Sequence, residues 1–192
     1  MKKISIVLFI TIIFSCKGKK DHISDPDEIE SIQELVNEIF EKDKEVYYLS
    51  LSAEDKLRGT LSSIYFTYKF KDTYFDQTYD VQSKTFSDPA KKSYDYKKGF
   101  KIGDLDIGSI PEWYMEALQI LNDKELLIED KLYYLDDWNY RVDNKGKIYA
   151  RFALNYYLSS HSRSSGRGRV TTTTYASHDF LLKDNQLKLL NH

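Results

Sequence analysis

The sequence predicts an α+β protein built from two units, each a helix followed by a four-stranded antiparallel sheet. Two apolar patterns with helical spacing are each followed by runs in which polar and apolar residues alternate. Sixteen tyrosines and ten phenylalanines favour strands, whereas only eight glycines and three prolines argue against a low-complexity chain. The repeated order indicates a possible tandem duplication, with units at residues 29–108 and 109–192.

In the first unit, an amphipathic helix is expected to begin near Asp25 and Pro26. Aspartate can cap a helix and proline suits its first turn. Apolar residues then recur at helical spacing as far as Phe40. Strands are expected at residues 45–52, 60–70, 73–82 and 93–101, with a tight turn at residues 71–72.

The second unit is expected to begin with a helix at Ser109. Ser109 and Glu112 have the spacing of a capping box, and Pro111 suits the first turn. Turn residues at 143–146 and 183–186 predict two hairpins. The expected strands are residues 126–135, 138–142, 147–160 and 169–182, followed by a short strand at 187–190.

The first fifteen residues have the form of a signal peptide. Lys2 and Lys3 precede an uncharged, mostly apolar run over residues 4–14, which is too short to span a bilayer. The sequence therefore predicts export from the cytoplasm.

The end of this leader, Ile13-Phe14-Ser15-Cys16, resembles the lipobox of bacterial lipoproteins. The resemblance implies cleavage before Cys16 and attachment of lipid to its thiol, and two or three acyl chains anchor a protein stably. It places the protein at the membrane of the cell envelope, and Lys17, in place of an aspartate, favours the outer membrane. Residues 16–28 are expected to be a flexible tether. A plain secreted protein and an uncleaved anchor are the alternatives.

The order of elements also resembles known folds. Tandem modules of one helix and four strands occur in β-lactamase-inhibitor-like and PepSY-like lipoproteins. The strands after residue 147 also resemble the end of an NTF2-like cone, which would imply a pocket between helix and sheet.

Composition and motifs argue against several functions. Without Lys2 and Lys3, the chain has 26 basic and 30 acidic residues. This mildly acidic balance lacks the excess of positive charge that is typical of nucleic-acid-binding proteins. The four histidines are scattered and Cys16 is the only cysteine, so we expect neither a metal nor another cofactor. No G-x-S-x-G motif is present, and the adjacent Asp136 and Asp137 are interpreted as solvated charges. No catalytic residue is predicted.

Two groups of residues are candidates for binding. Arg163, Arg167 and Arg169 lie near a predicted hairpin tip, and arginine binds anions through a rigid donor fork. A second group of tyrosines is expected on the sheet face opposite the helices, where such rings suit protein or carbohydrate contact: Tyr65, Tyr74, Tyr149 and Tyr157. A charged mobile tip and a merely half-buried sheet are the simpler interpretations.

These observations predict a non-enzymatic binding module for a protein or glycan partner. The alternative is a small-ligand-binding or hydrolytic enzyme with an NTF2-like pocket.

Overall fold

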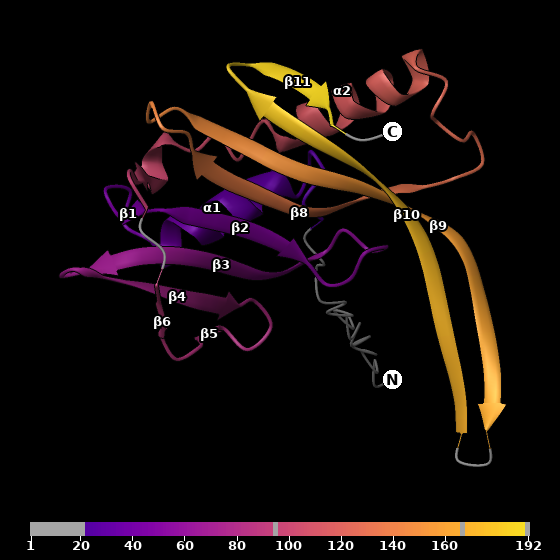
Figure 1. Ribbon diagram of the computed structural model, residues 1–192, viewed down its shortest axis with the longest axis horizontal. Coiled ribbons are helices and arrows are strands. Elements are labelled where there is room, and N and C mark those ends of the chain that lie inside the picture. The colour runs from indigo at the N-terminus through magenta and orange to yellow at the C-terminus, as the bar shows by residue number, and fades with distance from the viewer. Residues whose placement is uncertain (1–21, 94–95, 166–167, 191–192) are drawn as a thin grey trace, which may run out of the picture.

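The computed structural model describes residues 22–93, 96–165 and 168–190, with the backbone alone for residues 163–165 and 168–170 (Figure 1). Its helices are α1 (Ile29–Ile39), the short 3-10 helix η1 (Ile102–Asp104) and α2 (Ile110–Asp123). The strands are β1 (Glu45–Val46), β2 (Tyr48–Ala53), β3 (Leu61–Phe70), β4 (Thr73–Asp80), β5 (Thr85–Phe86), β6 (Ala90–Lys92), β7 (Phe100–Lys101), β8 (Tyr133–Val142), β9 (Ile148–Ser165), β10 (Gly168–Lys183) and β11 (Gln186–Leu189).

One antiparallel sheet of nine strands runs through both halves of the chain, in the order β11-β10-β9-β8-β2-β3-β4-β5, with β6 also paired to β4. The strands of the first half and those of the second half meet where β2 pairs with β8, for example Leu51 with Trp138. The α+β class is therefore confirmed. The two sheets expected from the sequence are continuous with each other, and β1 and β7 form a separate two-stranded ribbon.

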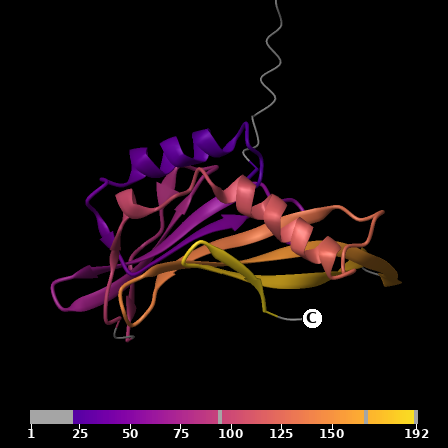
Figure 2. The same cartoon turned by 90° about the horizontal axis from the view of Figure 1, so that it is seen from above.

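The two α-helices, α1 and α2, lie on the same face of this sheet (Figure 2). Strand residues alternate between the two faces, so Leu49 and Leu51 of β2 point into a core that also contains Ile32 and Val36 of α1. In the second half, Trp138, Phe152 and Phe180 stack across β8, β9 and β10, with ring centroids 4.5 and 5.2 Å apart. Among the described residues, no helix lies on the opposite face of the sheet.

Three expected turns are confirmed. Phe70 pairs with Thr73 across residues 71–72. Gly146 has φ +86°, a conformation that glycine adopts without strain, in the turn between β8 and β9. Asp184 and Asn185 both have positive φ, which matches a two-residue hairpin turn.

Four local expectations differ from the structure. The expected tether of residues 16–28 is folded from residue 22 onward, because Ile23 is fully buried and its N–H donates to the Gly59 carbonyl (3.0 Å). Of the strand expected at 93–101, only Phe100–Lys101 is a described strand. The run at 126–135 is mostly loop, and its end joins residues 138–142 in β8 through a bulge. Ser109 precedes α2 without a side-chain cap hydrogen bond, since its Oγ instead accepts from Trp113 Nε1 (3.1 Å).

The hairpin of β9 and β10 is much longer than the rest of the sheet. Pairing with β8 ends at Tyr156 of β9, and pairing with β11 begins at Phe180 of β10. Beyond these positions and within the described parts of the chain, the two strands pair only with each other, as far as Ser165 and Gly168. They project away from the body as a two-stranded arm (Figure 1).

Candidate functional site

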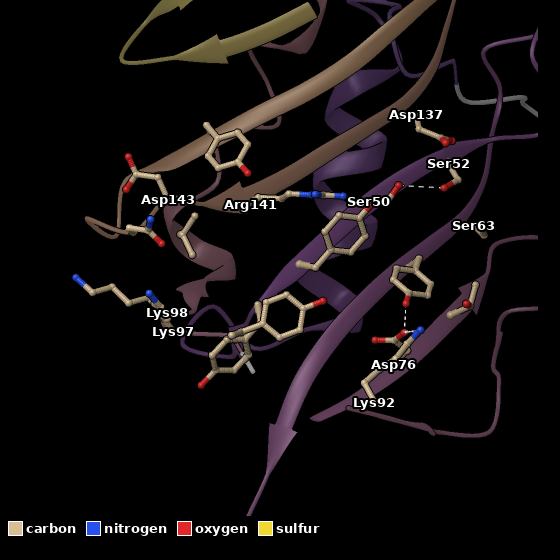
Figure 3. Close-up of a pocket in the computed structure, with 18 residues that line it drawn as sticks. Ser50, Ser52, Ser63, Asp76, Lys92, Lys97, Lys98, Asp137, Arg141 and Asp143 are labelled. Atoms are coloured by element: carbon tan, nitrogen blue, oxygen red, sulfur yellow. Dashed lines mark hydrogen bonds and ion pairs between the residues drawn. The ribbon is translucent and has the colours of Figure 1, made fainter. Parts of the chain in front are cut away.

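A cavity of about 930 Å³ lies on the helix-free face of the sheet, over β2, β3, β4 and β8 (Figure 3). Its shape follows from the sequence, because the short side chains Ser50, Ser52 and Ser63 lie between taller tyrosines on the same face. The segment after β6 adds Tyr96, Lys97 and Lys98. The remaining lining residues are Tyr47, Tyr48, Tyr65, Asp76, Thr78, Lys92, Asp137, Arg141, Val142, Asp143, Asn144 and Tyr149.

Asp76 organises one end of the cavity. Its carboxylate accepts hydrogen bonds from the Tyr65 hydroxyl and from Thr67 Oγ1 (2.7 Å) on β3. Lys92 Nζ lies 2.7 Å from the same carboxylate. The side chain of Asp76 is only 6% exposed, so these partners satisfy a buried negative charge. The Asp76 carboxylate therefore has a structural role at this end of the cavity, since protein groups already occupy it.

Arg141 lies on the β8 side of the cavity. Its guanidinium carbon is 4.9 Å from the centroid of the Tyr48 ring, within the range of a cation–π contact. The Tyr48 hydroxyl donates to the Asn139 side chain, which holds this ring in place. Arg141 is exposed, so its guanidinium is accessible from solvent.

Tyrosines pack the base of the wall that carries Lys97 and Lys98. The Tyr74 hydroxyl donates to the Tyr96 carbonyl (2.8 Å), and the ring of Tyr47 contacts both the Tyr74 and Tyr96 rings, at 4.9 and 5.9 Å. Burial and the neighbouring Glu45 raise the pKa of Tyr47 to about 12, so its hydroxyl stays protonated at neutral pH.

The pKa values of two cavity acids, Asp143 and Asp137, are shifted in opposite directions. Asp143 lies 2.6 Å from Lys183 Nζ and accepts from two backbone N–H groups, which lower the pKa of its carboxyl. Asp137 is half-buried. Burial, and then the nearby charge of Asp136, raise the pKa of Asp137 above its ordinary value.

The structure brings together some of the residues predicted to bind. Tyr65 and Tyr149 line the cavity. Tyr74 is on the same face but is buried beneath the wall, where it contacts Tyr96. Tyr157 lies further along β9, outside the cavity, and Lys131 Nζ is 5.5 Å from its ring centroid.

The predicted arginines and the lipid site lie elsewhere. Arg163 and Arg169 are at the far end of the arm, where only their backbone is described, and Arg167 and Cys16 are outside the described residues. Sequence reasoning missed Arg141, Lys97 and Lys98. The one signal for Arg141 was its place in an alternating run, in which Asn139 and Arg141 share a face opposite Trp138 and Tyr140.

Among the described residues, no three His, Cys, Asp or Glu side chains gather closely enough to hold a metal ion. None of the described helices combines the length and apolar character needed to cross a membrane.

Comparison with known protein families, with curated proteins and with solved structures finds no match to this chain.

Proposed function

We propose that this protein is a lipid-anchored lipoprotein of the cell envelope that binds a glycan in the cavity on its helix-free face, without catalysing a reaction. The cavity carries the proposal: its volume of about 930 Å³ falls within the usual range of ligand sites. Its lining supplies tyrosine rings, serine hydroxyls and charged groups in one place.

The chemistry of this lining favours a glycan over a protein surface. A sugar ring has apolar C–H faces and a rim of hydroxyls, and tyrosine offers an apolar ring with a polar tip. Ser50 and Ser52, whose oxygens lie 3.1 Å apart on the floor, can both donate and accept hydrogen bonds. A protein interface is more often a broad surface with an apolar centre, whereas this site is hollow and polar.

The lipobox Ile13-Phe14-Ser15-Cys16 supports the anchor. Lipid on Cys16 would hold the mature chain at a membrane, which we propose is the outer membrane because Lys17 follows the cysteine. Cys16→Ala should abolish partitioning of the mature form into the detergent phase. A processed product that still partitions into detergent would contradict lipidation at Cys16.

The same proposal includes an internal duplication, as in the tandem modules that the element order resembles. Each half passes from a helix into a meander of strands, β2-β3-β4-β5 and β8-β9-β10-β11. The first strands of the two meanders, β2 and β8, pair antiparallel near the middle of the sheet, as a two-fold arrangement of repeats would require.

Glycan binding is tested by filling the cavity. Ser63→Trp places a large ring among the lining residues, whereas Ser177→Trp places the same ring at an exposed position of β10 on the same sheet face. The detergent-solubilised lipoprotein and both variants are applied to an array of microbial glycans. We expect the wild type and Ser177→Trp to retain the same glycans and Ser63→Trp to lose them. Retention of no glycan, or equal retention by Ser63→Trp, would contradict the proposal.

A second function, hydrolysis of the bound saccharide, is favoured by one observation. Asp137 lines the cavity, and burial raises the pKa of its carboxyl, which is the direction that a general acid requires. The release of new reducing ends from a retained glycan, lost in Asp137→Asn, would establish this second function. Under the main proposal no reducing ends are released.

A further inference from the structure

Building on the glycan-binding function proposed above, we infer that the glycan is anionic and that Arg141 binds its carboxylate or phosphate group, with Lys97 and Lys98 adding positive charge from the cavity wall. The inference extends the proposal from a general saccharide to an acidic one, and it depends on the charge balance of the cavity and the position of Arg141.

Some of the charged side chains that line the cavity form ion pairs and others do not. Lys92 is paired with Asp76, and Asp143 is paired with Lys183, so these two acids are already neutralised. Within the part of the chain that the structure describes, Arg141, Lys97 and Lys98 have no carboxylate within 4.0 Å. Among the described lining residues, one acid, Asp137, also has no cationic group within 4.0 Å of its carboxylate. The cavity therefore presents an excess of positive charge to a ligand.

Arg141 is the best placed of these cations to bind an anion directly. The Tyr48 ring supports its guanidinium, and the Tyr48 hydroxyl is itself fixed by Asn139. A guanidinium that stacks on a ring still directs its N–H groups outward in its own plane, where a carboxylate or a phosphate can accept two of them. Figure 3 shows Arg141 extending over the strands of the floor toward Ser50.

The lysines lie on the wall segment rather than on the floor. Lys98 Nζ donates to the carbonyl of Lys145 (3.1 Å), which ties this segment to the turn between β8 and β9. That contact uses one ammonium hydrogen and leaves the positive charge uncompensated, because the acceptor is neutral. Lys97 and Lys98 would thus strengthen binding of a ligand that carries more than one negative charge.

The rest of the cavity indicates that the anion belongs to a larger polar molecule. A volume of about 930 Å³ far exceeds the needs of a free phosphate ion. The hydroxyls of Ser50 and Ser52, and the ring of Tyr149, lie in the same cavity and suit the body of a saccharide. Carboxylate sugars and phosphorylated sugars share the chemistry that Arg141 would recognise.

The test compares three oligosaccharides of equal length by isothermal titration calorimetry with the detergent-solubilised mature lipoprotein. One carries uronate carboxylates, one carries phosphates, and one is neutral. The variants are Arg141→Gln, which removes the charge, and Arg141→Lys, which keeps the charge but loses the fork. Arg58→Gln is the matched control, because Arg58 is an exposed arginine outside the cavity whose ion pairs are with Glu54 and Asp55.

We expect the wild type to bind at least one anionic saccharide about tenfold or more tightly than the neutral one. Arg141→Gln should remove that advantage without changing affinity for the neutral saccharide. Arg141→Lys should be intermediate, and Arg58→Gln should match the wild type. The tighter of the two anionic probes identifies the recognised group.

The outcomes separate the two proposals. Equal affinity for neutral and anionic saccharides, or an anionic preference that survives in Arg141→Gln, would overturn the inference and leave glycan binding intact. Absence of binding to all three saccharides, together with an empty glycan array, would overturn the proposed function as well.

Discussion

At the scale of single residues, Asp76 joins three strands under the cavity. It accepts hydrogen bonds from Tyr65 and Thr67 of β3, and it pairs with Lys92 of β6. Because the carboxylate is buried, the loss of one donor leaves part of its charge unsatisfied. The strands of the floor and the start of the wall therefore depend on this single side chain.

Tyr65→Phe should lower the free energy of unfolding by about 1–2 kcal/mol, because it removes one charge-assisted donor to Asp76 and keeps the ring. Tyr149→Phe is the control: Tyr149 lines the same cavity, but its hydroxyl has no hydrogen-bond partner among the described residues. Urea denaturation measures both variants. Equal stability of the two variants would show that the bond to Asp76 contributes nothing.

Asp143 should make stability depend on pH in the acid range. Lys183 and the backbone N–H groups of Lys147 and Lys145 lower the pKa of its carboxyl in the folded state. A lowered folded-state pKa contributes stability above the unfolded-state pKa, about 4, and that contribution is lost as pH falls below it. The midpoint of urea denaturation should therefore fall less between pH 5 and pH 2 in Asp143→Asn than in the wild type. The same substitution at the exposed Asp88 is the control, and its denaturation midpoint should change with pH as the wild-type midpoint does. If the midpoint of Asp143→Asn also changes with pH as the wild-type midpoint does, this account is contradicted.

At the scale of elements, the segment before α1 belongs to the fold. Ile23 is fully buried, and His22 forms a β-bridge with Thr60. Ile23→Ala should destabilise the protein by about 2–4 kcal/mol, because it leaves a cavity in the core. Ile128→Ala, at a side chain that is 42% exposed, should cost far less. If both variants unfold at the same denaturant concentration, this segment is only loosely attached.

The arm of β9 and β10 should contribute little to the stability of the body. Near its end the two strands pair with no other described strand, and an isolated hairpin is marginally stable in water. Replacing Arg163, Arg167 and Arg169 together by Gln should therefore change the melting temperature by less than about 2 °C. A larger drop, measured by calorimetry, would mean that this end of the arm packs against other parts of the molecule.

Local signals predicted some elements and failed for others. Turn residues such as Gly146, Asp184 and Asn185 fix a backbone conformation by themselves, and their turns are confirmed. The run at 93–101 alternates like a strand, but β5 and β6 already pair with the outer side of β4. Tyr96 instead packs on Tyr74. Alternation of polar and apolar residues shows which side chains would share a face of a strand. It does not show whether a neighbouring strand has an edge free to pair with that strand.

At the scale of the whole molecule, the joining of the two halves could not be read from sequence. β2 and β8 are far apart along the chain, and an alternating strand looks the same whether it lies at the edge or at the centre of a sheet. The tyrosine face was predictable, because side-chain alternation placed Tyr65 and Tyr149 opposite the helices. Arg141 was not predictable, because a single arginine in a strand resembles any solvated residue. Only the folded structure shows that it lies over the Tyr48 ring in a cavity that Lys97 and Lys98 also line.

The most direct test of glycan binding is a crystal structure of the mature protein with a saccharide retained on the array. We expect the sugar in the cavity over β2, β3 and β8, between Tyr48 and Tyr149, with an anionic group within hydrogen-bonding distance of Arg141. A saccharide bound on the β9–β10 arm or on the helix-covered side, with the cavity empty, would contradict the account.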